Sequence, residues 1–174
     1  LAALEAGIIN HRDKIRCNGH VEVSKRKFHC WKRDGHGNVD LVKSLRESCD
    51  VYYYELAQKV GIEKIAEVAR ILGLGQSFDI EMSAVTSGIV PDKLWKLSAR
   101  SREWVVGDTV NSSIGQGYVL ASPLQLAVMI ARIATGNEIL PRLIESINGV
   151  KAGEETSKLK LNKNNLNLVR KALF

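Results

Sequence analysis

Apolar residues recur three or four positions apart in one stretch near the middle of the first half of the chain. They are Val42, Leu45, Cys49, Tyr52 and Leu56. This spacing places them on one face of a helix. Asn38 is suited to be the N-cap, and Asp40 adds a negative charge to the first turn. The pattern therefore predicts a helix over residues 38–61.

The tripeptide Ser48-Cys49-Asp50 lies in the centre of this predicted helix. In an unbroken helix, two side chains that are two residues apart diverge by about 200°. Ser48 and Asp50 can therefore face one cleft only if the helix relaxes here. In an extended tripeptide the first and third side chains face one way and the second faces the other. Cys49 would then point away from that cleft.

The rest of the chain shows further helical patterns and one strand pattern. Helices are predicted to end at residue 7 and to cover 62–72, 124–135 and 164–174, and a strand is predicted over 140–147. Residues 76–101 and 108–121 are predicted to be irregular, and 151–165 to form an exposed loop. The helix over 124–135 is apolar on nearly all sides, which predicts a central core helix.

The composition is typical of a globular domain, with 45% hydrophobic and 25% charged residues in 174. No run of 18 apolar residues is present. The chain begins and ends within predicted helices, so we expect it to be a piece of a larger protein. The net charge of +6 is partly due to basic residues at 14–16 and 25–27. A basic face can be merely solvated, or it can bind nucleic acid or another anionic surface.

All three cysteines and all four histidines fall within the first 49 residues. Three thiolates and one imidazole form a closed tetrahedral zinc site, and Cys17, Cys30, His36 and Cys49 are the natural set. His29 or His20 can replace His36 in this set. The spacing matches no short signature such as C-x-x-C. A disulfide between Cys17 and Cys30, closing a hairpin of residues 21–23 and 28–29, and buried free cysteines therefore remain alternatives.

Four stretches carry a resemblance to a known family. They are residues 1–7, Phe28-His29-Cys30-Trp31 with His36-Gly37, residues 48–54, and residues 107–127 with Ser113-Ile114-Gly115-Gln116-Gly117. Through them the chain resembles the transpeptidase domain of class B penicillin-binding proteins, most closely the elongation enzymes. The likeness is weakest over residues 151–165. It implies an α+β fold of the serine β-lactamase-like type, of which this chain supplies a mostly helical fragment and a small N-terminal hairpin region.

The resemblance implies that residues 1–174 are one partial transpeptidase domain. Its expected parts are a Cys/His-rich hairpin insert over 11–37 and helices with an S-x-D motif over 38–75. Irregular loops over 76–121 follow, and a core helix, a strand and a C-terminal helix occupy 122–174.

The family has three motifs, of which S-x-x-K supplies the nucleophilic serine and its lysine, and K-T-G lies on a strand beside the cleft. The chain contains the second motif, as Ser48-Cys49-Asp50. The first motif is expected upstream of residue 1 and the third beyond Phe174. Ser24 and Ser157 begin chance matches to S-x-x-K in polar segments. The resemblance thus implies that this segment by itself is inactive.

The implied activity is that of a peptidoglycan D,D-transpeptidase, which cross-links stem peptides in cell-wall elongation through an acyl-serine and is a target of β-lactams. Ser48 would relay a proton to the leaving amine, and Asp50 would bind the nucleophile's lysine or the substrate amide. The implied partners are a membrane glycan polymerase and elongation-complex scaffold proteins, with no nucleic acid. The implied location is the periplasmic domain of a protein anchored in the inner membrane.

In that compartment both a disulfide and zinc are possible. A disulfide leaves His36 without a role, whereas a structural Zn²⁺ ion uses Cys17, Cys30, His36 and Cys49 together. Zinc is therefore favoured, since it would tie the hairpin to the back of the second motif. A zinc-stabilised basic nucleic-acid-binding module is the alternative from another functional class.

Overall fold

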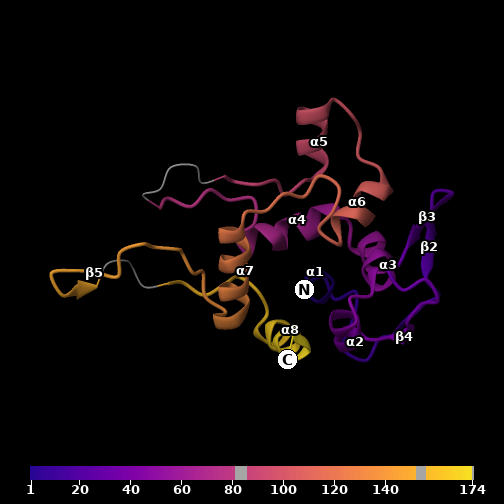
Figure 1. Ribbon diagram of the computed structural model, residues 1–174, viewed down its shortest axis with the longest axis horizontal. Coiled ribbons are helices and arrows are strands. Elements are labelled where there is room, and N and C mark those ends of the chain that lie inside the picture. The colour runs from indigo at the N-terminus through magenta and orange to yellow at the C-terminus, as the bar shows by residue number, and fades with distance from the viewer. Residues whose placement is uncertain (81–85, 152–155, 174) are drawn as a thin grey trace.

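The protein is an elongated α+β structure with more helix than strand (Figure 1). This computed structural model describes residues 1–80, 86–151 and 156–173. The helices are α1 (Ala2–Glu5), α2 (Leu41–Arg46), α3 (Asp50–Val60), α4 (Ile62–Ile71), α5 (Lys93–Arg100), α6 (Val106–Ser112), α7 (Pro123–Thr135) and α8 (Lys163–Leu173). The strands are β1 (Ile15–Cys17), β2 (His20–Val23), β3 (Arg26–His29), β4 (Gly37–Val39), β5 (Ser146–Ile147) and β6 (Val150–Lys151). The expected fold class is confirmed.

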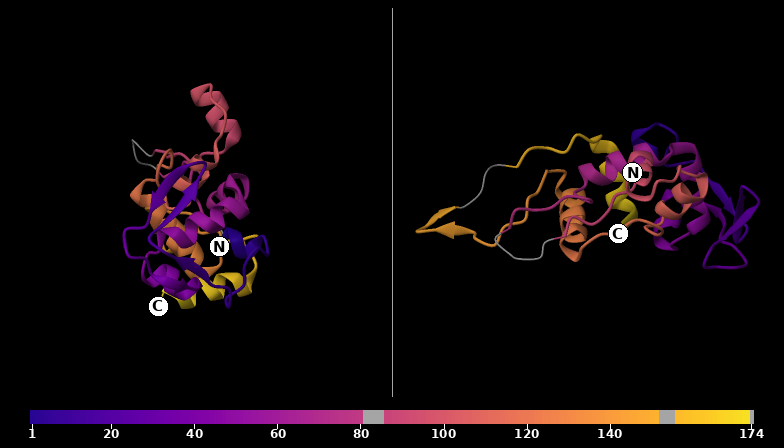
Figure 2. Two further views of the ribbon diagram at one scale, coloured as in Figure 1. Left: turned by 90° about the vertical axis from the view of Figure 1, so that its right-hand side faces the viewer. Right: turned by 90° about the horizontal axis from the view of Figure 1, so that it is seen from above.

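The strands form three antiparallel pairs, β1 with β4, β2 with β3, and β5 with β6. In the second pair His20 lies opposite His29 and Val23 lies opposite Arg26, which confirms the predicted N-terminal hairpin. The β5–β6 hairpin lies at the other end of the molecule from β2 and β3 (Figure 2). The strands that contact α3, the helix that begins at Asp50, are β1, β2 and β3 near the N-terminus.

Helix α3 is at the centre of the main apolar core. Its side chains Val51, Tyr52, Tyr54 and Leu56 are buried in one cluster with the three cysteines and Val39. A second cluster joins α1, α2 and α8 through Leu4, Leu41 and Val169. The end of α4 packs on the segment before α8 in a third cluster. The N-terminal strands and the neighbouring helices α1, α2, α4 and α6 thus hold α3 in place.

The predicted helix over 38–61 is divided into two helices. Asn38 is not its N-cap, because it lies in β4 opposite Arg16. The N-cap is Asp40, whose side chain accepts a hydrogen bond of 2.9 Å from the main-chain N–H of Lys43. The break falls between α2 and α3 at Ser48, as the expected relaxation of the helix requires.

Two short helices lie in segments that were predicted to be irregular. Helix α5 begins after Asp92, whose side chain accepts a hydrogen bond of 2.7 Å from the N–H of Trp95. Helix α6 begins after Val105, whose N–H donates to Asp108 over 2.9 Å. These caps satisfy N–H groups that a short helix leaves free, so the prediction was wrong at both places. Residues 81–85 of the first segment lie outside the described residues.

The C-terminal third also differs from the prediction. Helix α7 buries only Gln125, Val128 and Arg132, while Leu126 and Ile130 are about half exposed, so it is not a central core helix within this chain. The strand predicted over 140–147 is limited to β5, because no other described strand pairs with 140–145. Helices α4 and α8 are confirmed, and α8 begins within the loop predicted over 151–165, of which residues 152–155 lie outside the described part.

None of the helices in the described part of the chain is both long enough and apolar enough to cross a membrane.

Candidate functional site

The turn between α2 and α3 carries the Ser48-Cys49-Asp50 motif. Ser48 has a left-handed backbone with φ of +48°, which costs a residue other than glycine about 1–2 kcal/mol. The N–H of Cys49 donates to the carbonyl oxygen of Ser44 over 3.0 Å. Ser48 is exposed, Cys49 is fully buried and Asp50 is half-buried. The three side chains therefore divide between two sides of the turn.

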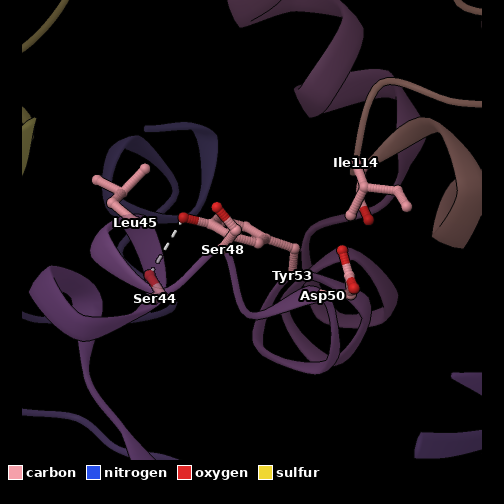
Figure 3. A pocket seen from close by; sticks show the side chains of 7 residues that line it. Ser44, Leu45, Ser48, Asp50, Tyr53 and Ile114 are labelled. Carbon is pink, nitrogen blue, oxygen red and sulfur yellow. Dashed lines mark hydrogen bonds between the residues drawn. The ribbon is translucent and has the colours of Figure 1, made fainter. Parts of the chain in front are cut away.

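Ser48 and Asp50 line the same cavity, which has a volume of about 260 Å³ (Figure 3). The other lining residues are Ser44, Leu45, Tyr53, Ser113 and Ile114. Ser113 and Ile114 come from the glycine-rich stretch after α6. The tertiary structure thus brings together two of the stretches that were singled out in the sequence.

Ser44 and Tyr53 are cavity residues that sequence reasoning missed. Their hydroxyl groups are hydrogen-bonded over 3.1 Å (Figure 3). Burial raises the pKa of the Tyr53 phenol, so this hydroxyl stays protonated near neutral pH. The available signal was their spacing, since Ser44 precedes Ser48 by one helical turn and Tyr53 follows Asp50 by nearly one.

On the other side of the turn, Cys17, Cys30, His36 and Cys49 form a buried cluster. Their ligand atoms all lie within 4.8 Å of one another. Cys17 ends β1, Cys30 follows β3, His36 precedes β4 and Cys49 is the N-cap of α3. All three cysteines are free thiols, so the Cys17–Cys30 disulfide is not formed. The structure thus brings together the four residues expected to form a metal site.

The imidazole of His36 is oriented with Nδ1 towards the sulfur atoms. Nδ1 lies 3.6 Å from Sγ of Cys17 and 3.5 Å from Sγ of Cys30. Nε2 is buried without a hydrogen bond, and its nearest carboxylate oxygen, from Glu47, is 4.0 Å away. His20 and His29, the alternative ligands, are exposed on the hairpin and do not belong to the cluster. The set of donor atoms can hold a metal ion through Nδ1 of His36.

Two glycines allow the loops around the cluster to approach each other. Gly35 has φ of +79°, and a Cβ atom added to it would collide with the carbonyl oxygen of Cys17. Gly19 has φ of +87°, and its Cβ would collide with the carbonyl oxygen of Arg33. Only a residue without a side chain fits at either position.

Within the cluster, the pKa values of Cys17 and Cys49 are shifted in opposite directions. Burial raises the pKa of Cys49 to about 12, and the neighbouring Cys17 and Cys30 reinforce the effect. Burial also acts to raise the pKa of Cys17, but main-chain N–H groups of Gly19 and His36 and the neighbouring thiols lower it overall. Ionisation of Cys49 is therefore less favourable than ionisation of Cys17. A divalent cation would remove the penalty for ionising the remaining thiols.

The model of the penicillin binding protein transpeptidase domain family matches residues 1–174. The peptidoglycan D,D-transpeptidase MrdA of Acinetobacter baumannii is 34% identical over 154 residues, which are 87% of this chain and 23% of that protein. The chain thus spans about a quarter of the length of this relative.

Two solved structures are also similar. Pseudomonas aeruginosa PBP2 in complex with WCK 5153 has a TM-score of 0.91 and 30% identity, over 98% of this chain and 40% of that one. Helicobacter pylori PBP2, in its complex with MreC, has a TM-score of 0.86 and 37% identity, over 99% of this chain and 31% of that one. The chain therefore belongs to the penicillin-binding protein transpeptidase family, as part of a class B member of the elongation type.

Proposed function

We propose that the chain is part of a peptidoglycan D,D-transpeptidase that cross-links stem peptides during cell-wall elongation and reacts with β-lactams. The observation that carries this proposal is the shared cavity of Ser48 and Asp50 in a family member. The domain parts given above for residues 1–174 belong to the same proposal. The chain alone, without the S-x-x-K serine and K-T-G, would neither cross-link peptides nor react with a β-lactam.

The proposed reaction has two acyl-transfer steps. A nucleophilic serine outside this chain attacks the penultimate D-Ala carbonyl carbon, the bond to the terminal D-Ala breaks, and D-Ala leaves as an amine after taking up a proton. An amine of a second stem peptide then attacks the acyl-serine ester. It loses a proton as the new amide forms, and the serine regains its hydrogen.

Ser48 is the proposed proton relay to the leaving amine. Its hydroxyl is exposed at the cavity and its left-handed backbone fixes the direction of the side chain. Asp50 is the proposed partner of the nucleophile's lysine or of the substrate amide, for which a carboxylate at the first position of α3 supplies the charge.

Zn²⁺ is the proposed ion of the cluster formed by Cys17, Cys30, His36 and Cys49. Tetrahedral zinc, with bonds of about 2.3 Å to sulfur and 2.0 Å to nitrogen, separates these two kinds of atom by about 3.5 Å. The sulfur–nitrogen distances of 3.6 and 3.5 Å fit this value. When bound, zinc would cross-link β1, the loop after β3 and the start of α3. Its role is structural, since all four ligands come from the protein.

The proposed location is the periplasmic domain of a protein anchored in the inner membrane. The proposed partners are a membrane glycan polymerase and elongation-complex scaffold proteins. The complex of MreC with a similar PBP2 supports a partner of this kind. The family match over residues 1–174 favours a transpeptidase over a nucleic-acid-binding module.

The experiment is acylation of the complete protein by a labelled penicillin. Replacement Ser48→Ala should slow acylation by about a hundredfold. Asp50→Asn should slow it less, since the family motif also accepts Asn. The control Ser24→Ala changes an exposed turn serine and should have no effect. Equal acylation of the Ser48→Ala variant and the unmodified protein would falsify the proposed role.

Zinc is tested separately by elemental analysis and thiol counting on the same protein. We expect about one zinc ion per chain and three reduced thiols. A metal-free protein with a bond between Cys17 and Cys30 would exclude the zinc site.

A further inference from the structure

Trp31 makes three hydrogen bonds to the turn that carries the motif. Its main-chain N–H donates to Oδ2 of Asp50 over 2.9 Å. Its indole Nε1–H is shared between the carbonyl oxygens of Glu47, over 3.0 Å, and Ser48, over 2.9 Å. Trp31, which lies outside the motif, therefore contacts both the main chain around Ser48 and the carboxylate of Asp50.

The indole is not placed by burial, since 64% of the residue is exposed. It packs edge-on against the imidazole of His36, with ring centroids 5.4 Å apart. Trp31 also directly follows Cys30. Its position is thus set by two members of the buried cluster on one side and by the motif on the other.

Ser48 needs such support because its backbone is left-handed. A strained conformation persists only where surrounding contacts over-determine it. The two carbonyl groups that accept from the indole precede and follow the φ and ψ angles of Ser48. Holding both carbonyls on one donor fixes the peptide groups on either side of this residue.

Asp50 is oriented by the same residue. The main-chain N–H of Trp31 engages Oδ2 and limits rotation of the carboxyl group. Within the described residues no second hydrogen bond holds this carboxylate, so Oδ1 is left to meet a ligand in the cavity. The geometry fixes one oxygen atom and leaves the other available.

We propose that Trp31 is a positioning residue of the second motif, which holds the left-handed turn at Ser48 and the carboxylate of Asp50. The assignment rests on the proposed function where acylation is the measurement. A direct measurement of the indole hydrogen bond tests the assignment independently of the proposed function.

The first test uses the metal-loaded complete protein and Trp31→Phe, which keeps an aromatic ring beside His36 and removes the indole donor. The matched control is Trp104→Phe, which removes an indole hydrogen bond of 2.7 Å to Thr109. We expect the saturating acylation rate of Trp31→Phe to fall about tenfold at nearly unchanged penicillin affinity and metal content. Trp104→Phe should remain within about twofold. Unchanged acylation, or a loss that follows loss of metal, would overturn the proposal.

The second test uses the wild-type protein, so its result does not depend on whether a variant folds. Tryptophan-selective ¹⁵N labelling of the metal-loaded wild-type protein allows hydrogen exchange of each indole N–H to be followed by NMR. We expect the Trp31 indole to exchange at least about tenfold more slowly than a free indole, despite its exposure. Exchange at the free rate would overturn the proposal. If wild-type protein is not acylated, the proposed function fails, whereas this measurement still decides the role of Trp31.

Discussion

Ser48 and Cys49 are neighbours in the chain but lie on opposite sides of the turn between α2 and α3. The side chain of Ser48 is exposed at the cavity, while that of Cys49 is fully buried among Cys17, Cys30 and His36. The left-handed φ of +48° at Ser48 separates the two directions. The cluster thus lies immediately behind the motif, and a change on one side of the turn is expected to affect the other.

Replacement Cys49→Ser removes one sulfur donor from the cluster and leaves a volume close to the original. We expect metal content to fall well below one ion per chain and Tm to fall by on the order of 10 °C, because metal binding is coupled to folding. Elemental analysis and calorimetry check this. His20→Ala, at an exposed histidine outside the cluster, is the control and should keep both values.

The two glycines beside His36 should differ in their tolerance of alanine. Gly35→Ala places a methyl group against the carbonyl oxygen of Cys17, so the cluster must deform, and we expect its metal content to fall. Gly37→Ala meets no atom within 4 Å and should cost only the left-handed strain, about 1 kcal/mol. Metal content and urea unfolding of the two variants test the difference. Equal losses would show that the close approach of the loops is not required.

Lys96 forms a buried ion pair with Asp108 that joins α5 to α6. The two charged groups are 2.5 Å apart and Lys96 is only 5% exposed. Lys96→Ala would leave the carboxylate of Asp108, whose side chain is only 15% exposed, with the hydrogen bond from Val105 but without its charged partner. We expect a loss of about 2–3 kcal/mol in the free energy of unfolding. Lys93→Ala, at an exposed position on the same helix, should change it by less than about 0.5 kcal/mol. Denaturant unfolding of both variants provides the comparison.

Asp92 should make stability depend on pH in the acid range. Burial acts to raise its pKa, but hydrogen bonds from the N–H of Trp95 and from Arg70 lower it overall. A carboxyl group with a lowered pKa stabilises the folded state above its ordinary pKa, near 4, and loses this effect as pH falls through the folded value. We expect Asp92→Asn to lower stability at pH 7 by about 0.5–1 kcal/mol, since Asn keeps the cap but not the charge.

The pH effect at Asp92 is checked by urea unfolding of wild type and variant from pH 7 down to pH 2. The difference should shrink to near zero at the acid end. Asp79→Asn, at an exposed carboxylate, should show little difference at any pH. A constant difference for Asp92→Asn would mean that the charge is not involved.

The sequence alone determined the elements whose signals are local. The periodic helices α4 and α8 and the β2–β3 hairpin were predicted from residue spacing. The break in the helix at Ser48 was predicted because Ser48 and Asp50 can face the same cleft only if the helix is interrupted between them. The four candidate ligands were chosen by residue type, because cysteine and histidine are the side chains that zinc prefers.

The tertiary structure decided what depends on residues far apart in the chain. It placed Asn38 in β4, because its main chain pairs with β1, and it selected His36 over His20 and His29 by bringing Nδ1 to the sulfur atoms. It joined Trp31 to Asp50 across 19 positions. It also left one face of α7 exposed. Residue spacing describes which face of an element is apolar, but only packing determines which partner lies against that face.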